Sequence, residues 1–145
     1  MKDVNSVNKI IKTFFEKKEW RFQEIKEENF DVFFIYFYKD DSNSDDSWSI
    51  MLSINEEGKF VQLLSILETR ELKFIEEKMK LFEFLFEINQ KHKLIKCSYL
   101  DNKIIYFIDL FTGLALLNEE QLDRSFDAML YNLTYSYENI KDFLE

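Results

Sequence analysis

Two side chains suited to nucleophilic or metal chemistry lie close together in this sequence. The chain has one histidine, His92, and one cysteine, Cys97, five positions later. A cysteine nucleophile needs a neighbouring base, and this spacing would permit such a pair. We favour the interpretation that His92 follows a helix whose negative C-terminus attracts the ring, and that Cys97 is a small core residue. Two ligands are also too few for a structural zinc site, which usually has four.

An acidic segment, 39–47 (KDDSNSDDS), has part of the spacing of a calcium-binding loop. The oxygen-bearing side chains at the first, third and fifth positions of that pattern are Asp41, Asn43 and Asp45. The sixth position is aspartate where the loop needs glycine for a sharp turn, and the twelfth is leucine where it needs a bidentate glutamate. The segment is therefore predicted to be a solvated loop, and no metal or other cofactor is expected.

Neither the carboxylates of the last predicted helix nor the glycines have the arrangement of a catalytic or phosphate-binding site. Asp123 and Asp127 lie one turn apart on a predicted helix. Such a pair acts as acid and base only where the environment separates the two pKa values, and this pair lies beside an apolar stripe on the side predicted to face water. The two glycines, Gly58 and Gly113, are too far apart for a phosphate-binding loop. The sequence therefore favours a protein that is not an enzyme.

Composition and charge narrow the class of partner. The 145 residues are 46% hydrophobic, which predicts one folded domain over 1–145. The formal net charge of -9 argues against nucleic acid and anionic membranes as partners. The longest apolar run, 32–38, is too short to span a bilayer, and the N-terminal segment has no apolar signal-peptide core. These features predict a cytoplasmic protein.

The elements that would position these side chains follow from apolar spacing. Residues 3–17 have apolar side chains at helical spacing, with Asp3 as a possible N-cap. Alternation begins a strand at Trp20 and Phe22, and further strands are predicted at 30–38, 48–54, 60–67, 95–99 and 104–110. The strand at 30–38 is apolar on both faces, which is typical of a central strand or one covered on both sides.

Two further helices complete the predicted order. One covers about 70–91 with Thr69 as its cap. The last begins after Asn118, which forms a capping box with Gln121 and is flanked by an apolar staple of Leu117 and Leu122. The order α-β-β-β-β-α-β-β-α, with strands and helices in blocks, predicts an α+β fold with a mainly antiparallel sheet and helices packed on it.

The helix at 70–91 has more apolar surface than one sheet needs. One of its stripes contains Leu72, Ile75, Met79, Phe82 and Phe86. A second stripe contains Phe74, Leu81, Leu85 and Ile88. Together they cover roughly 220° of the helix, whereas packing on one sheet needs nearer 100°. We expect the second stripe to contribute to a homodimer interface, although the pattern does not decide which stripe faces the partner. On the last helix, Tyr131 and Tyr135 are further interface candidates; the alternative is that both are half-buried.

The segment 48–145 resembles the YbjN-type proteins, which are thought to share the fold of type III secretion chaperones. The segments that carry the resemblance are FVQLLSIL (60–67), LFEFLFEIN (81–89), KHKLIKCSYLDNKI (91–104) and LNEEQLDRSFDAML (117–130). No single motif is specific; the order and spacing are what match. The resemblance implies helices on an antiparallel sheet, homodimers, and a non-enzymatic role in binding another protein. It transfers no catalytic residues, and the acidic loop and Cys97 depart from it.

The expected function is therefore a non-enzymatic protein-binding module, chaperone-like or regulatory, acting as a homodimer with an unidentified protein partner. An acidic immunity or antitoxin-like inhibitor of a basic protein is one alternative. A small-ligand-binding domain with a pocket between sheet and helices is another, although the scarcity of histidine, cysteine and glycine argues against it.

Overall fold

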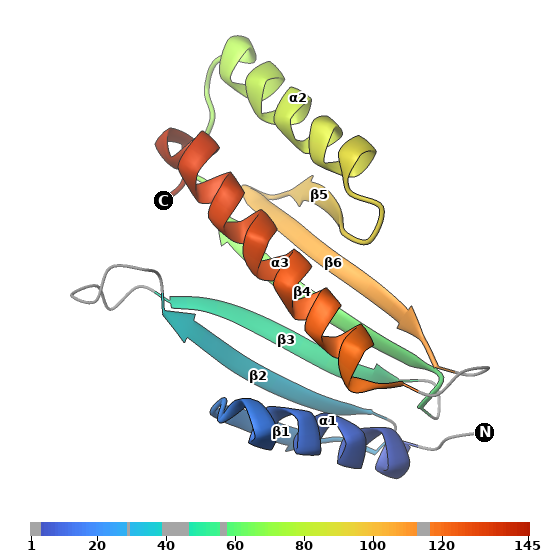
Figure 1. Ribbon diagram of the computed structural model, residues 1–145. Helices are drawn as coiled ribbons and strands as arrows, with labels where there is room; N and C mark the ends of the chain where they lie inside the picture. Colours follow the sequence, from blue (N-terminus) through green and yellow to red (C-terminus); the bar gives the residue numbers. More distant parts are fainter. Residues whose placement is uncertain (1–3, 29, 39–46, 56–57, 113–116) are drawn as a thin grey trace.

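Over the residues that the structure describes, three α-helices and six strands follow one another in the predicted order. The computed structural model describes residues 4–28, 30–38, 47–55, 58–112 and 117–145. The elements are α1 (Val4–Lys18), β1 (Phe22–Lys26), β2 (Asp31–Tyr38), β3 (Ser47–Asn55), β4 (Phe60–Glu68), α2 (Ile75–Lys91), β5 (Lys96–Leu100), β6 (Lys103–Phe111), α3 (Glu119–Ile140) and a short 3₁₀ helix, η2 (Lys141–Phe143). The α+β prediction is confirmed (Figure 1).

The six strands form one antiparallel sheet in the order β1-β2-β3-β4-β6-β5. β6 pairs with β4 in the middle of the sheet, so the β5–β6 hairpin places β5 at an edge. Asp101 and Asn102 both have positive φ, 51° and 61°. This is the backbone that a tight two-residue hairpin requires, so the turn ends one residue earlier than the sequence predicts, and Lys103 begins β6.

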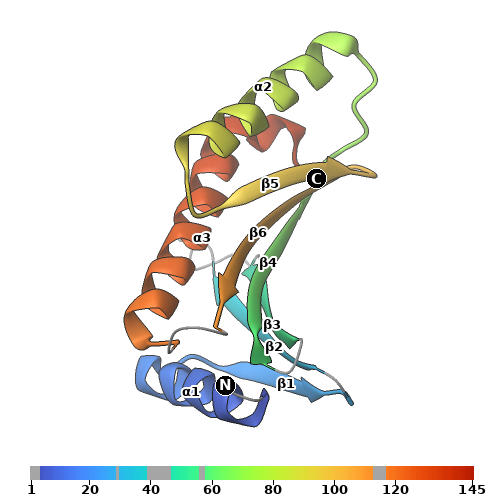
Figure 2. The same ribbon diagram turned by 90° about the vertical axis from the view of Figure 1, so that its right-hand side faces the viewer.

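All three helices lie on one face of the sheet. α3 lies along the sheet, α1 lies near β1, and α2 lies near β5 (Figure 1). Figure 2 shows the sheet nearly edge-on, with α3 on one side and no helix on the opposite side. The strand β2 is paired with β1 and β3, as predicted for a central strand, but helices cover only one of its faces. We call the other face, over the described residues, the open face.

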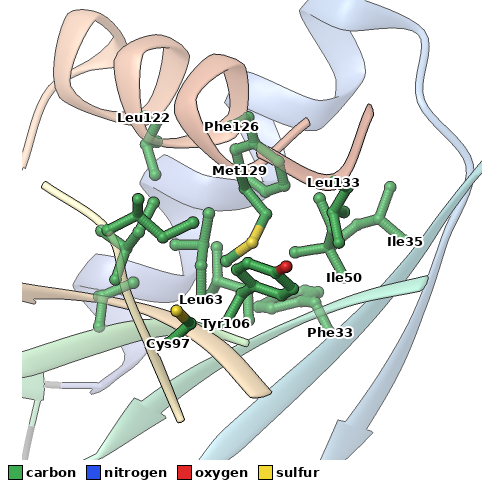
Figure 3. Close-up of a cluster of buried hydrophobic side chains, with 14 of the residues drawn as sticks. Phe33, Ile35, Ile50, Leu63, Cys97, Tyr106, Leu122, Phe126, Met129 and Leu133 are labelled. Atoms are coloured by element: carbon green, nitrogen blue, oxygen red, sulfur yellow. The ribbon is translucent and has the colours of Figure 1, made fainter. Parts of the chain in front are cut away.

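The core lies between the helices and the sheet (Figure 3). Alternate residues of β4, including Val61 and Leu63, are fully buried, so the period of two selects the face that packs. Phe126 of α3 is also fully buried. Its ring contacts those of Phe14, Phe15, Trp20 and Phe37, with centroids 5.0 to 6.3 Å apart. Trp20 joins this cluster from the turn before β1, so the strand starts at Phe22 and not at Trp20 as predicted.

The start of α2 differs from the prediction. α2 begins at Ile75, and its N-cap residue, Phe74, makes no side-chain cap bond. Thr69 forms an isolated bridge with Leu144 instead, and its backbone N–H donates to the carbonyl of Asn102 at 2.8 Å. Thr69 is therefore a bridge to the C-terminal segment and not a helix cap. The predicted cap of α1, Asp3, lies outside the described residues.

The start of α3 agrees with the prediction. The Asn118 side chain accepts a hydrogen bond from the Gln121 backbone N–H at 2.9 Å, and the Gln121 side chain accepts one from the Asn118 backbone N–H at 3.1 Å. The flanking Leu117 and Leu122 are both buried. Within the described residues, no helix has both the length and the apolar character needed to cross a membrane.

We expect Asn118→Ala to lower the free energy of unfolding by about 1 kcal/mol, because it removes the side-chain oxygen that satisfies a helix N–H. The measurement is the midpoint of urea unfolding, with Asn139→Ala as the control. Asn139 is exposed and its amide only donates to the Tyr135 carbonyl within the same helix. Equal midpoints for the Asn118→Ala protein and the unsubstituted protein would contradict the capping role.

Candidate functional site

Cys97 and His92 have separate partners. The Cys97 side chain is buried between β5 and α2, and its thiol donates to the Leu85 carbonyl at 3.5 Å. Burial raises the pKa of this thiol from 9.0 to about 11. The His92 ring packs against the Tyr131 ring at 6.0 Å between centroids. A buried thiol with a raised pKa is a poor nucleophile, so the geometry favours the core interpretation of Cys97.

The calcium-like pattern of the acidic segment falls where the structure gives no description: Asp41, Asn43 and Asp45 all lie outside the described residues. Among the described residues, no group of three or more histidine, cysteine, aspartate or glutamate side chains is placed to hold a metal ion. Asp123 forms an ion pair with Lys18 at 2.7 Å, which joins α3 to α1. The hydrogen bond that Lys18 donates to Asp123 raises the pKa of Lys18, so this carboxylate has a structural partner.

Along α2, one of the two predicted apolar stripes is buried and the other is exposed to solvent. Leu81, Leu85 and Ile88 are buried in the protein's own core, at 0%, 5% and 1% exposure. These three side chains are therefore unavailable to a partner, so the prediction that they contribute to an interface is wrong. The physical reason is that α2 uses this stripe to cover β5 at the edge of the sheet. Phe74, the fourth residue predicted for the interface, is 64% exposed.

The other predicted stripe faces solvent along α2, and its first member, Leu72, precedes the helix and is buried. Its exposed members are Ile75 at 73%, Met79 at 55%, Phe82 at 50% and Phe86 at 63%. We call these four residues the α2 stripe. Phe82 touches the Tyr99 ring of β5 at 5.8 Å between centroids, so the stripe borders the β5 edge of the sheet. Large exposed apolar patches of this kind mark interaction surfaces.

A single side chain occupies part of the outer edge of β5. The Asn89 side chain accepts a hydrogen bond from the Cys97 backbone N–H at 2.8 Å and donates one to the Cys97 carbonyl at 3.0 Å. The amide thus takes the place that a seventh strand would occupy beside Cys97. Natural sheets protect their edges in ways such as this against further strand pairing. A partner at this edge is therefore expected to contact side chains of α2 and not to extend the sheet.

Tyr131 and Tyr135 form part of an aromatic ladder between α2 and α3. The Tyr131 and Tyr135 rings stack at 6.1 Å, and Tyr135 stacks on Phe84 of α2 at 5.6 Å. Tyr135 is half-buried, whereas Tyr131 is 59% exposed. The ladder mainly joins the two helices, so Tyr135 has a packing role and only Tyr131 offers a large surface to a partner.

The open face has a continuous apolar row that the sequence analysis did not identify. Strand pairing aligns Phe34, Met51, Leu64 and Phe107 across β2, β3, β4 and β6. Tyr36, Ile66 and Phe111 lie on the same face and are 53%, 45% and 50% exposed. The sequence feature that could have indicated this row is the run of apolar residues on both faces of β4 and β6. Such runs usually mark strands covered on both sides, and here one side has no helix among the described residues.

A hollow of about 540 Å³ lies between α2 and the end of α3, lined by Glu77, Lys80, Phe84, Asn139, Ile140, Asp142 and Phe143. Glu77 is already paired with Arg70, which lowers the pKa of Glu77. This pairing leaves Lys80, Asn139 and Asp142 as the other polar side chains that line the hollow. The two apolar surfaces are the stronger candidates for function.

Comparison of the chain with protein-family models, with curated proteins and with solved structures finds no match.

Proposed function

We propose that this protein is a non-enzymatic protein-binding module that acts as a homodimer and holds an apolar segment of another protein on its open face. The observation that carries the proposal is the row Phe34–Met51–Leu64–Phe107, together with the exposed side chains beside it. A role of this kind is chaperone-like or regulatory. It requires recognition and no chemical step.

The energetics favour an apolar partner. Fully burying one large apolar side chain contributes about 1.5–3 kcal/mol, so covering several side chains of the open face yields a useful affinity after the cost of association. The face has few charges, and one of them, Asp109, is hydrogen-bonded to Gln62 at 2.8 Å. The net charge of -9 lies mostly elsewhere, where it supports solubility.

The test compares variants of the two surfaces. We expect the double substitution Ile66→Gln and Phe111→Gln to weaken binding of a captured partner by about tenfold or more, since both side chains leave the contact. Partners are captured from native lysate, purified and titrated by calorimetry. Leu94→Gln is the control, because it removes an apolar side chain that is 40% exposed in the turn between α2 and β5. Equal affinities for the two variants, with melting temperatures unchanged, would contradict the proposal.

The dependence of binding affinity on salt concentration distinguishes this proposal from the alternative of an acidic inhibitor. The net charge of -9 is the observation that favours an immunity or antitoxin-like protein acting on a basic partner. Binding through surface charge weakens strongly as salt rises to about 0.5 M, whereas an apolar contact persists. Affinity that survives the added salt supports the open face, and affinity that disappears supports the acidic inhibitor.

A further inference from the structure

We infer that the α2 stripe is the seam of a parallel, two-stranded helix pair between two copies of this chain. The inference rests on the homodimer proposed above, and it names the contact, the orientation and the register. It is independent of the open face, which lies on the opposite side of the sheet.

The spacing of the stripe is the first argument. Ile75, Met79, Phe82 and Phe86 follow one another at intervals of four, three and four residues. This is the d-a-d-a spacing of a coiled coil, which repeats every 3.5 residues and keeps one seam toward a partner helix. The four side chains are 50% to 73% exposed in the single chain, so this seam is not filled by another described part of the same protein.

The charges beside the seam decide the orientation. In this heptad assignment Lys78 takes a g position, and Glu76 and Glu83 take e positions. A parallel pair places Lys78 of one copy beside Glu83 of the other, twice by symmetry. An antiparallel pair places Glu83 of one copy near Glu76 of the other, so like charges meet. Lys78 and Glu83 are both exposed in the protein. The charge pattern therefore fits a second copy of this chain in the parallel orientation.

Area and preorganisation support the same occupant. Aromatic side chains bury roughly 150–250 Å² each. With the smaller Ile75 and Met79, the α2 stripe and Phe74 therefore expose several hundred Å² per copy, a large part of the ~800 Å² of a standard interface. α2 is already folded and held to β5 by Leu81, Leu85 and Ile88. Association therefore loses less conformational entropy than the pairing of two free helices of this length. The Asn89 amide at the β5 edge opposes the competing arrangement, in which two sheets join edge to edge.

The first experiment measures the oligomeric state by light scattering and sedimentation. We expect the unsubstituted protein to be a dimer at about 10 μM, and Phe86→Glu to raise the dimer dissociation constant about a hundredfold or more, because two copies of the residue leave the seam. Phe86 is 63% exposed, so circular dichroism should show an intact fold. Phe111→Glu is the matched control on the open face and should remain a dimer. A monomeric unsubstituted protein, or a dimer that survives Phe86→Glu, overturns the inference.

The second experiment tests orientation by oxidative cross-linking, with Cys97→Ala as the background. In a parallel pair, Ile75→Cys chains link to each other and Phe86→Cys chains link to each other. A mixture of the two gives no mixed product, because the sites are about 16 Å apart along the helix. An antiparallel pair gives the mixed product instead, which overturns the parallel arrangement. Phe86, Ile75 and Cys97 lie outside the open face, so a dimer that survives Phe86→Glu while the partner still binds rejects only this inference and leaves the open-face proposal standing.

Discussion

Replacing Phe126 with alanine should lower the free energy of unfolding by about 4 kcal/mol, the largest effect expected of a single substitution in this protein. Phe126 is fully buried and packs its ring against aromatic side chains from α1, the turn before β1, and β2. The substitution removes the apolar contacts and leaves a cavity. The neighbouring rings are large and rigid, so the cavity collapses only in part.

The control for this prediction is Tyr131→Ala, five positions further along the same helix. Tyr131 is 59% exposed, so its loss should change stability by about 0.5 kcal/mol or less. Both variants are measured by denaturant unfolding, and two-state behaviour is checked by coincident circular dichroism and fluorescence transitions. A cost for Phe126→Ala below about 2 kcal/mol would show that the joint between α1, α3 and the sheet is loosely packed.

Local signals in the sequence predicted those parts of the fold that neighbouring residues determine. The α3 capping box is one example, because Asn118 and Gln121 satisfy each other's backbone within one turn. The alternation of β4 is another, since a period of two selects its buried face whatever lies above it. By contrast, Thr69 has the residue type of a helix cap, but its role depends on Leu144, far away in the sequence.

The candidate site was less predictable, for a physical reason. Helical spacing shows how wide the apolar surface of α2 is, but not the direction in which each stripe points. That direction depends on where α2 settles against β5, which buries Leu81 and exposes Phe82. The exposure of the open face was unpredictable for the same reason. Leu64 and Phe107 look like core residues in the sequence, and only the placement of all three helices on one side leaves them without a helix above.

The second large effect is expected at a buried polar cluster between α1 and the edge of the sheet. The Asn8 amide donates to Asp31 and to Glu24, both at 2.6 Å, and Lys12 pairs with Glu24 at 2.8 Å. Asn8 and Asp31 are each 5% exposed. A buried carboxylate that loses its donor keeps the cost of desolvation without the bond that offset it. Asn8→Ala should therefore lower the free energy of unfolding by about 3 kcal/mol at neutral pH.

The pH dependence of this loss identifies its cause. Burial raises the pKa of Glu24, but the hydrogen bonds from Asn8 and Lys12 outweigh burial and hold it below its ordinary value of 4.5. A carboxyl whose pKa is lower in the folded protein stabilises it above the unfolded pKa, and that stabilisation disappears as the pH falls through the folded value. Asn8→Ala removes one of the two bonds. The difference in stability between variant and unsubstituted protein should thus shrink from neutral pH to about pH 3. Urea unfolding at several pH values measures it, with Asn139→Ala as the control, and a difference that is constant with pH would indicate lost packing and not lost hydrogen bonding.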